Sequence, residues 1–271
     1  MKKKTILVAA IAVMLVAALV VGGTLAYFTD KTEAKKNTFT VGNVGIGLTE
    51  TEWHADADHT LVPGKFYDKN PTITVKDNSQ DAYVFLKLDL NKYVSLINLM
   101  GVDAYKNNIG DLGDQKSPYY SDYPTYPGFM RFVEMLAKDN TLRAAVLDRW
   151  FVGVNHAEWK VMNLDQIKAG VEAAKNGQNP AHLVVVLGYQ KDGGVVKAND
   201  KVQFMTAFGM PETVTASMFD GEDAYRIGGV SKSNFNGTFN MTFTAYAIQA
   251  DQIANLDAAY EALGGYNAFV Q

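Results

Sequence analysis

The sequence predicts a mainly β protein: an antiparallel β-sandwich of the jelly-roll type, with a helical insertion and a short C-terminal helix. Two observations lead to this expectation. Several segments alternate apolar and polar residues with a period of two, and residues typical of turns separate them, as in sandwiches whose strands each bury one face. Apolar residues at helical spacing are instead concentrated between about residues 92 and 178, which defines the insertion.

The strand predictions rest on this alternation. The clearest strand lies near the C-terminus, where one face carries Phe239, Met241, Phe243, Ala245 and Ala247 and the other carries Asn240, Thr242 and Thr244. Even positions from Val84 to Leu90 are apolar in the same way, although Tyr83 and Phe85 make the opposite face less polar than expected. Further strands are predicted at 39–48, with a bulge or turn at 42–43, and at 72–75, 183–189 and 201–208. The sequence Asp192-Gly193-Gly194 suits a hairpin turn.

Three helical segments are expected. Phe129, Phe132, Val133 and Leu136 follow helical spacing, which predicts one or two helices over about 128–148. Asn163, with Gln166 three residues later, has the form of a capping box, so a helix should begin there and end near Gly177. A last helix from Asp251 would place Ile253, Leu256, Tyr260 and Leu263 on one face.

The N-terminus has the three parts of a secretory signal peptide. Lys2 to Lys4 precede an apolar run of sixteen residues, Ile6–Val21, and Thr24 and Ala26 are small residues at the positions that a signal peptidase reads. A membrane-spanning helix needs about 20 residues, so the run is short for a permanent anchor, which is the alternative. Cleavage before Tyr27 would leave residues 27–271 as a single domain. We expect contact with the membrane only before cleavage, through the signal peptide.

Composition excludes some functions. Without Lys2, Lys3 and Lys4, 22 basic residues face 29 acidic ones, so the processed chain has a net charge of −7 and no nucleic-acid partner is expected. The chain has no cysteine, which excludes disulfides, thiolate metal sites and a cysteine nucleophile. A hydrophobic content of 48% is that of a chain stabilised by a packed core.

Motifs for catalysis are scarce, and we expect no enzymatic activity and no cofactor. One stretch, His54, Asp56, Asp58 and His59, offers imidazole and carboxylate groups that would bind zinc or calcium if the loop folded them inward. The alternative is a solvated polar loop, because the helical His-Glu-x-x-His pattern of zinc peptidases is absent. His156 and His182 are isolated, and His182, at the start of an apolar strand, is interpreted as structural.

The N-terminal residues also carry a resemblance. Residues 22–30, Gly-Gly-Thr-Leu-Ala-Tyr-Phe-Thr-Asp, and residues 37–44, Asn-Thr-Phe-Thr-Val-Gly-Asn-Val, closely resemble exported Gram-positive proteins of the TasA and camelysin class. Family-like phrases return at 61–65, 83–85 and 244–250. The resemblance implies processing by the dedicated SipW-type signal peptidase. It also implies a secreted structural subunit of fibres in the biofilm matrix or at the cell surface, with a camelysin-like surface metallopeptidase as an alternative.

A mechanism for self-association follows from the freed N-terminus. Residues 27–40 have few helix signals and include Tyr27, Phe28 and Phe39 as apolar anchors, so the segment would add as a strand to the sheet edge of the next subunit. The alternatives are a flexible tail and the first strand of the same molecule. A third interpretation of the chain is a surface module that does not polymerise, whose insertion at 93–175 binds glycans or other matrix proteins.

Overall fold

The structure is a computed structural model of the 271-residue chain. It describes residues 44–53, 59–91, 147–175, 182–215 and 240–270, the backbone of 29–33 and 36–37, and residues 96, 99, 100 and 103.

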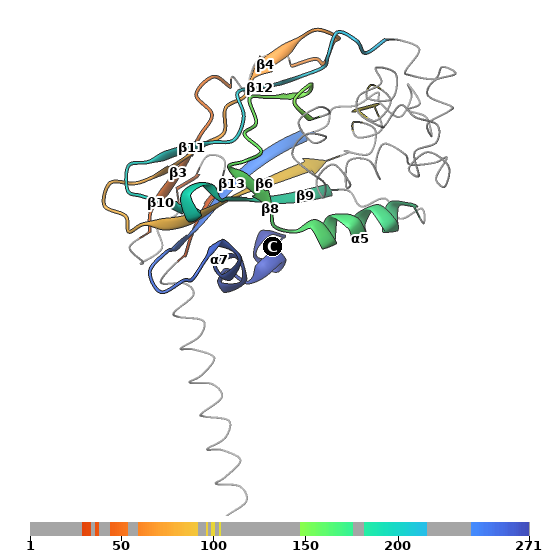
Figure 1. Ribbon diagram of the computed structural model, residues 1–271. Coiled ribbons are helices and arrows are strands. Elements are labelled where there is room, and N and C mark those ends of the chain that lie inside the picture. The colour runs from red at the N-terminus through yellow and green to blue at the C-terminus, as the bar shows by residue number, and fades with distance from the viewer. Residues whose placement is uncertain are drawn as a thin grey trace, which may run out of the picture.

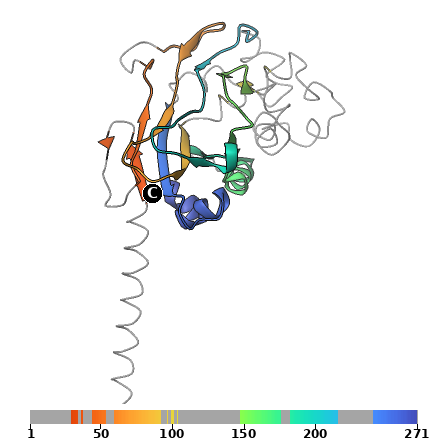
Figure 2. The same ribbon diagram turned by 60° about the vertical axis from the view of Figure 1, so that its left-hand side comes forward.

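The fold is mainly β, as predicted, and the described residues form three antiparallel sheets (Figures 1 and 2). The large sheet has the strand order β2 (Lys36–Asn37), β1 (Thr29–Glu33), β13 (Asn240–Gln249), β6 (Ala82–Asn91), β9 (His182–Tyr189) and β8 (Trp159–Val161), and β10 (Val195–Val196) also pairs with β6. A second sheet contains β11 (Lys201–Gln203), β5 (Thr72–Val75) and β3 (Ile46–Thr49). The third contains β4 (Phe66–Asp68), β12 (Ala207–Gly209) and β7 (Phe151–Val152).

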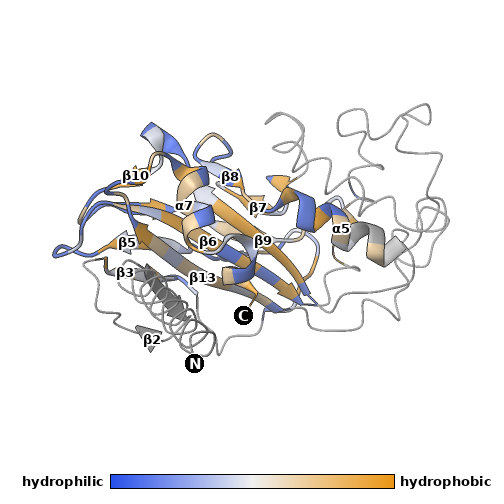
Figure 3. Cartoon of the chain, turned by 90° about the horizontal axis from the view of Figure 1, so that it is seen from below, coloured by the Kyte–Doolittle hydropathy of each residue, from blue (hydrophilic) through white to orange (hydrophobic). Residues whose placement is uncertain are grey.

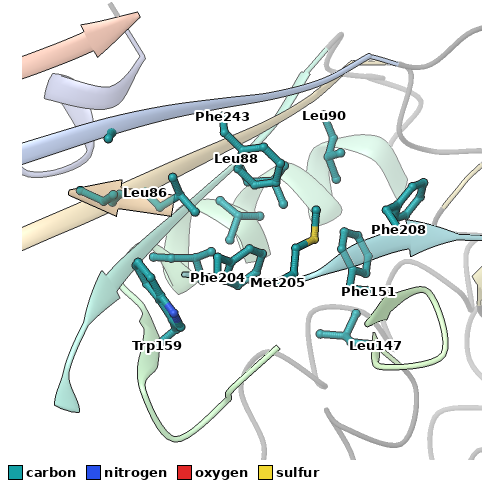
Figure 4. Packing of buried hydrophobic residues seen from close by; sticks show 14 of the residues in the cluster. Leu86, Leu88, Leu90, Leu147, Phe151, Trp159, Phe204, Met205, Phe208 and Phe243 are labelled. Carbon is teal, nitrogen blue, oxygen red and sulfur yellow. The ribbon is translucent and has the colours of Figure 1, made fainter. Parts of the chain in front are cut away.

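The main core lies on one face of the large sheet. Leu86, Leu88 and Leu90 of β6 and Phe243 of β13 point from this sheet toward Phe204, Met205 and Phe208 (Figure 4). All of these residues are buried, and Ile46 and Ile73 of the second sheet belong to the same cluster. The even positions of β6 therefore face the sandwich interior, as the period of two predicted.

The opposite face of the large sheet is covered by the C-terminal segment. Helix α7 (Leu256–Ala262) and the 3₁₀ helix η4 (Gly265–Phe269) lie against this face (Figures 1 and 3). They enclose a second cluster, which contains Tyr83, Phe85, Val184, Val186, Tyr246, Ile248, Leu256, Tyr260 and Phe269. The centre of the sheet is thus buried on both sides. This explains why Tyr83 and Phe85 are apolar at positions where a solvent-facing strand would have polar residues.

One predicted strand and one predicted turn need correction. The segment 201–208 is not one strand, because β11 pairs with β5 in the second sheet and β12 pairs with β4 and β7 in the third. The turn at 191–194 contains Asp192, Gly193 and Gly194 in left-handed conformations. It joins β9 to β10, and these strands pair with β6 instead of with each other, so it is no hairpin turn.

The described helices agree with prediction in place, but the cap predicted for the first and the start predicted for the second differ. Helix α5 (Leu164–Lys175) follows Asn163, whose side chain bonds to β9 and does not cap the helix. Helix α7 begins at Leu256 and not at Asp251, because Asn255 caps it by accepting a hydrogen bond from the Ala258 amide. Within 92–178, the described residues also include the strands β7 and β8. The predicted helical residues Phe129–Leu136, and Phe239 and Gly177, lie outside the described residues.

A buried polar cluster fastens the insertion to the sandwich. The carboxylate of Asp103, which is 1% exposed, accepts bonds from Arg149 Nε and Nη2 at 3.0 Å each and from Trp150 Nε1 at 3.3 Å. Thr213 Oγ1 donates to the same carboxylate at 2.7 Å. The cluster therefore joins Asp103, near the beginning of the insertion, to Arg149 and Trp150 further along it and to Thr213, which follows β12.

Candidate functional site

The strongest candidate site is the edge of the large sheet where the N-terminal segment meets the last strand. Strand β1 pairs with β13 in antiparallel register, with Thr29 opposite Ile248, Asp30 opposite Ala247 and Lys31 opposite Tyr246. Part of the predicted assembly strand thus lies in the sheet of its own molecule, which was one of the alternatives. The predicted anchors Tyr27, Phe28 and Phe39 lie outside the described residues, as do the cleavage positions Thr24 and Ala26.

The β13 side of this edge is apolar and firmly packed. Tyr246, Ala247 and Ile248 are 3%, 0% and 3% exposed, and β13 pairs with β6 along its whole length on the other side. Burial raises the pKa of Tyr246 to about 12, with a smaller contribution from the negative charge of Asp89, so the phenol stays neutral at physiological pH. Burial of this kind gives β13 a rigid place in the sheet, which is what a strand acceptor requires.

The β1 side is different in composition. Its sequence is Thr-Asp-Lys-Thr-Glu, without one apolar residue, and the two-residue strand β2 pairs with Thr32 and Glu33 at its outer side. Charged residues and short strands are common ways in which proteins protect a sheet edge from unwanted pairing. Strand β1 therefore offers main-chain pairing to β13 with no apolar residue of its own to bury there.

The predicted metal ligands are only partly described. His54, Asp56 and Asp58 lie outside the described residues. His59 stacks on the Trp53 ring with a centroid distance of 3.7 Å, and the Tyr67 ring meets its edge at 5.0 Å. Among the residues that the structure describes, no three His, Asp or Glu side chains gather as a metal-binding group would. The described part of the chain thus presents no ligand set through which metal chemistry could be derived.

The two isolated histidines each contact one carboxylate. His156 Nε2 lies 2.7 Å from Asp148 Oδ1, and His182 Nδ1 lies 2.7 Å from Asp89 Oδ1. The contact of His182 joins the neighbouring strands β9 and β6, in keeping with the structural role predicted for this histidine.

Sequence reasoning missed Lys69, a buried lysine that lies next to Trp53 and Glu50. Lys69 is 4% exposed, and its Nζ lies 2.8 Å from Glu50 and 4.0 Å from the centroid of the Trp53 ring. A lone lysine between polar residues gives no sign of burial in a sequence. Sequence reasoning also did not identify Tyr246 to Ile248 as the residues that pair with β1, although the apolar run at the end of the last strand was a usable signal.

The described residues contain no helix that is both long and apolar enough to cross a membrane. Comparisons with curated proteins and with solved structures gave no match. One family comparison did match, over a range that includes the N-terminal motifs and strands β1 to β6. Over residues 1–115, the chain is similar to the camelysin metallo-endopeptidase family, and this similarity supports its likeness to the TasA and camelysin class.

Proposed function

We propose that the protein is a secreted structural subunit of extracellular fibres, in a biofilm matrix or at the cell surface, and that it assembles by exchange of its N-terminal strand. The observation that carries the proposal is the pairing of the polar strand β1 with the buried strand β13 at the edge of the large sheet. The family similarity over residues 1–115 supports an exported protein of this class.

Exchange costs little when the same contacts form in both states. Strand β1 of one copy would make the same main-chain bonds to β13 of a second copy that it makes to its own β13. Such swapping of an identical element is a low-cost route to association. In the head-to-tail form of this exchange, each copy gives its strand to one neighbour and receives a strand from another, and this heterologous contact yields a filament when its rotation does not close a ring.

The connecting chain is long enough for this exchange. Residues 34–45 join β1 to the first buried strand region, and when fully extended these residues reach about 40 Å. A folded domain with as many residues as 27–271 has a radius of gyration of about 18 Å. Strand β1 would therefore reach a neighbouring subunit if β2 separated from it.

The absence of cysteine permits a direct test with a designed disulfide. Asp30 and Ala247 lie opposite each other in the register, and Cβ atoms of such antiparallel pairs are about 4.5 to 5.5 Å apart. We expect the double variant Asp30→Cys/Ala247→Cys, oxidised before assembly, to stay a covalently closed monomer that forms no filaments. Reduction should restore filament growth.

The order of the steps gives the decisive result. Oxidation after assembly should link each subunit to the next, so a non-reducing gel should show a ladder of covalent oligomers. The single variants Asp30→Cys and Ala247→Cys are the controls and should show no ladder. Filaments in which only intramolecular disulfides form would refute strand exchange.

The family description favours a second candidate, a camelysin-like metallopeptidase at the cell surface. This proposal needs His54, Asp56, Asp58 and His59, or residues elsewhere in the chain, to hold zinc or calcium. Metal analysis of the purified protein, together with peptide hydrolysis measured with and without a chelator, tests it. A metal-free protein without hydrolytic activity would exclude it.

A third candidate is a surface module that binds a glycan or a matrix protein through the insertion and does not polymerise. Its test is the state of association of the purified protein. A protein that stays monomeric and binds such a ligand would favour this function over fibre formation.

A further inference from the structure

The two lateral edges of the large sheet are completed in different ways. At one edge, β1 and β2 lie outside β13. At the other edge, β8 lies outside β9 but pairs with it only at Leu187, Gly188 and Tyr189. The backbone groups in the rest of the eight-residue strand β9 that face this edge therefore need partners other than β8.

One backbone amide and one side-chain amide continue the pairing beyond β8. The Met162 amide donates to Val186 O at 2.8 Å. Asn163 Nδ2 then donates to Val184 O at 2.8 Å, and Asn163 Oδ1 accepts from the Val186 amide at 2.8 Å. A primary amide offers a donor and an acceptor, as a peptide group does, so Asn163 makes the two bonds that a paired strand would make at this place.

The position of Asn163 suits this role. Its side chain is fully buried, and helix α5, which begins at the next residue, lies beside β9 (Figure 1). Ile167, one turn into the helix, is 1% exposed and packs in the main core. Without the Asn163 amide, the carbonyl of Val184 and the amide of Val186 would lose these partners. Unpaired groups of this kind on a strand form a template for pairing with another chain.

We propose that Asn163 closes the β9 edge against strand addition, so that, of the two lateral edges of the large sheet as the described residues form it, only the β13 edge accepts a strand. That β13 accepts a strand from another copy rests on the proposed function, whereas the closure of β9 rests on the bonds of Asn163 alone. Two open β9 edges from two copies are identical, and antiparallel pairing between them is related by a two-fold axis. Opening this edge would therefore produce dimers, or side-by-side pairs of filaments.

The test compares two variants of the full chain. Asn163→Ser removes both bonds to β9 but keeps a residue that is favoured at a helix start. Val185→Ala is the matched control, because this residue lies in the same strand, is 3% exposed in the main core and leaves the Asn163 bonds in place. We expect sedimentation to show a concentration-dependent dimer for Asn163→Ser and none for the wild-type chain or Val185→Ala. Filaments of Asn163→Ser should pair laterally in electron micrographs.

Hydrogen exchange at Val186 gives a second readout that includes the wild-type chain. The Val186 amide should be as strongly protected in the wild-type protein as amides of the central ladder, and about tenfold less protected in dilute Asn163→Ser. Protection should return as the variant dimerises. Rapid exchange of Val186 in the wild-type protein would overturn the closure, whether or not the variant folds.

The outcomes separate this inference from the proposed function. If wild-type filaments form without strand exchange, the proposed function fails, but a dimer of dilute Asn163→Ser would still support the closed edge. If strand exchange holds and folded Asn163→Ser associates as the wild-type chain does, the inference is wrong. Equal association of Asn163→Ser and Val185→Ala would also overturn it, because loss of stability would then be the cause.

Discussion

Lys69 and Glu50 form an ion pair against the indole ring of Trp53. Lys69 Nζ lies 2.8 Å from Glu50 Oε1 and 4.0 Å from the centroid of the Trp53 ring, and the lysine side chain is 5% exposed. Oε1 of Glu50 is buried and has no other donor in the described part of the chain. The two charges therefore depend on each other.

This dependence predicts a strong coupling. Removal of one member of a buried ion pair leaves an unpaired charge and costs about 3 to 5 kcal/mol, whereas replacement of both by apolar residues is often neutral. Because Glu50 is 22% exposed, we expect about 1 to 3 kcal/mol for Lys69→Met and for Glu50→Leu. The double variant should lose less than the sum of the two. Denaturant unfolding of the wild-type protein, the two single variants and the double variant gives the double-mutant cycle. Strictly additive losses of stability would disprove the coupling.

The two faces of β13 should respond differently to truncation. Phe243 is 2% exposed in the main core, and Phe243→Ala should lower the free energy of unfolding by about 3 to 5 kcal/mol. Thr242, on the other face, is exposed, and Thr242→Ala should change stability by about 0.5 kcal/mol or less. Chemical denaturation of both variants makes the comparison. Equal losses would contradict the two-faced packing of this strand.

Processing of the N-terminus can be predicted from residue size. If Thr24 and Ala26 fit the small pockets of a signal peptidase, N-terminal sequencing of the secreted protein should begin at Tyr27. The bulky Ala26→Leu should block cleavage, and Leu25→Ala serves as the control because residue 25 lies between the two recognised positions. Secreted protein that retains residues 6–21 would refute the signal peptide.

Deletion of the N-terminal strand separates folding from assembly. A processed chain without residues 27–36 lacks β1 but keeps β6, β9 and β13, so its far-UV circular dichroism should remain that of a β protein. It should form no filaments, because it has no strand to give. An unfolded product would mean that the pairing of β1 with its own β13 is essential to the monomer.

A synthetic peptide of residues 27–36 provides the complementary measurement. Added to the intact protein, it should occupy β13 without bringing a next subunit and thereby shorten the filaments, which electron microscopy would show. A peptide of the same composition in scrambled order is the control. Filaments of unchanged length with the native peptide would argue against β13 as the acceptor.

Local pattern predicted the strands that share one face with the core. The alternation in β6 and β13 placed Leu86, Leu88 and Phe243 on the interior side, because a strand has a period of two whatever its partners are. The same pattern could not say what covers the other face. Tyr83 and Phe85 are buried because α7 and η4 return to them from the end of the chain.

Only the tertiary structure decided the contacts between distant segments. Asn163 and Gln166 have the spacing of a capping box, but the side-chain amide of Asn163 bonds to the backbone of Val184 and Val186. Buried backbone groups without a partner are costly, and these two bonds satisfy one donor and one acceptor at the sheet edge. The register that sets Asp30 opposite Ala247 joins segments more than 200 residues apart. The sequence by itself determined the β class, the absence of disulfides and the polar composition of β1. Pairing partners, the burial of Lys69 and the closure of β9 were decided by folding, since these depend on which segments meet in space.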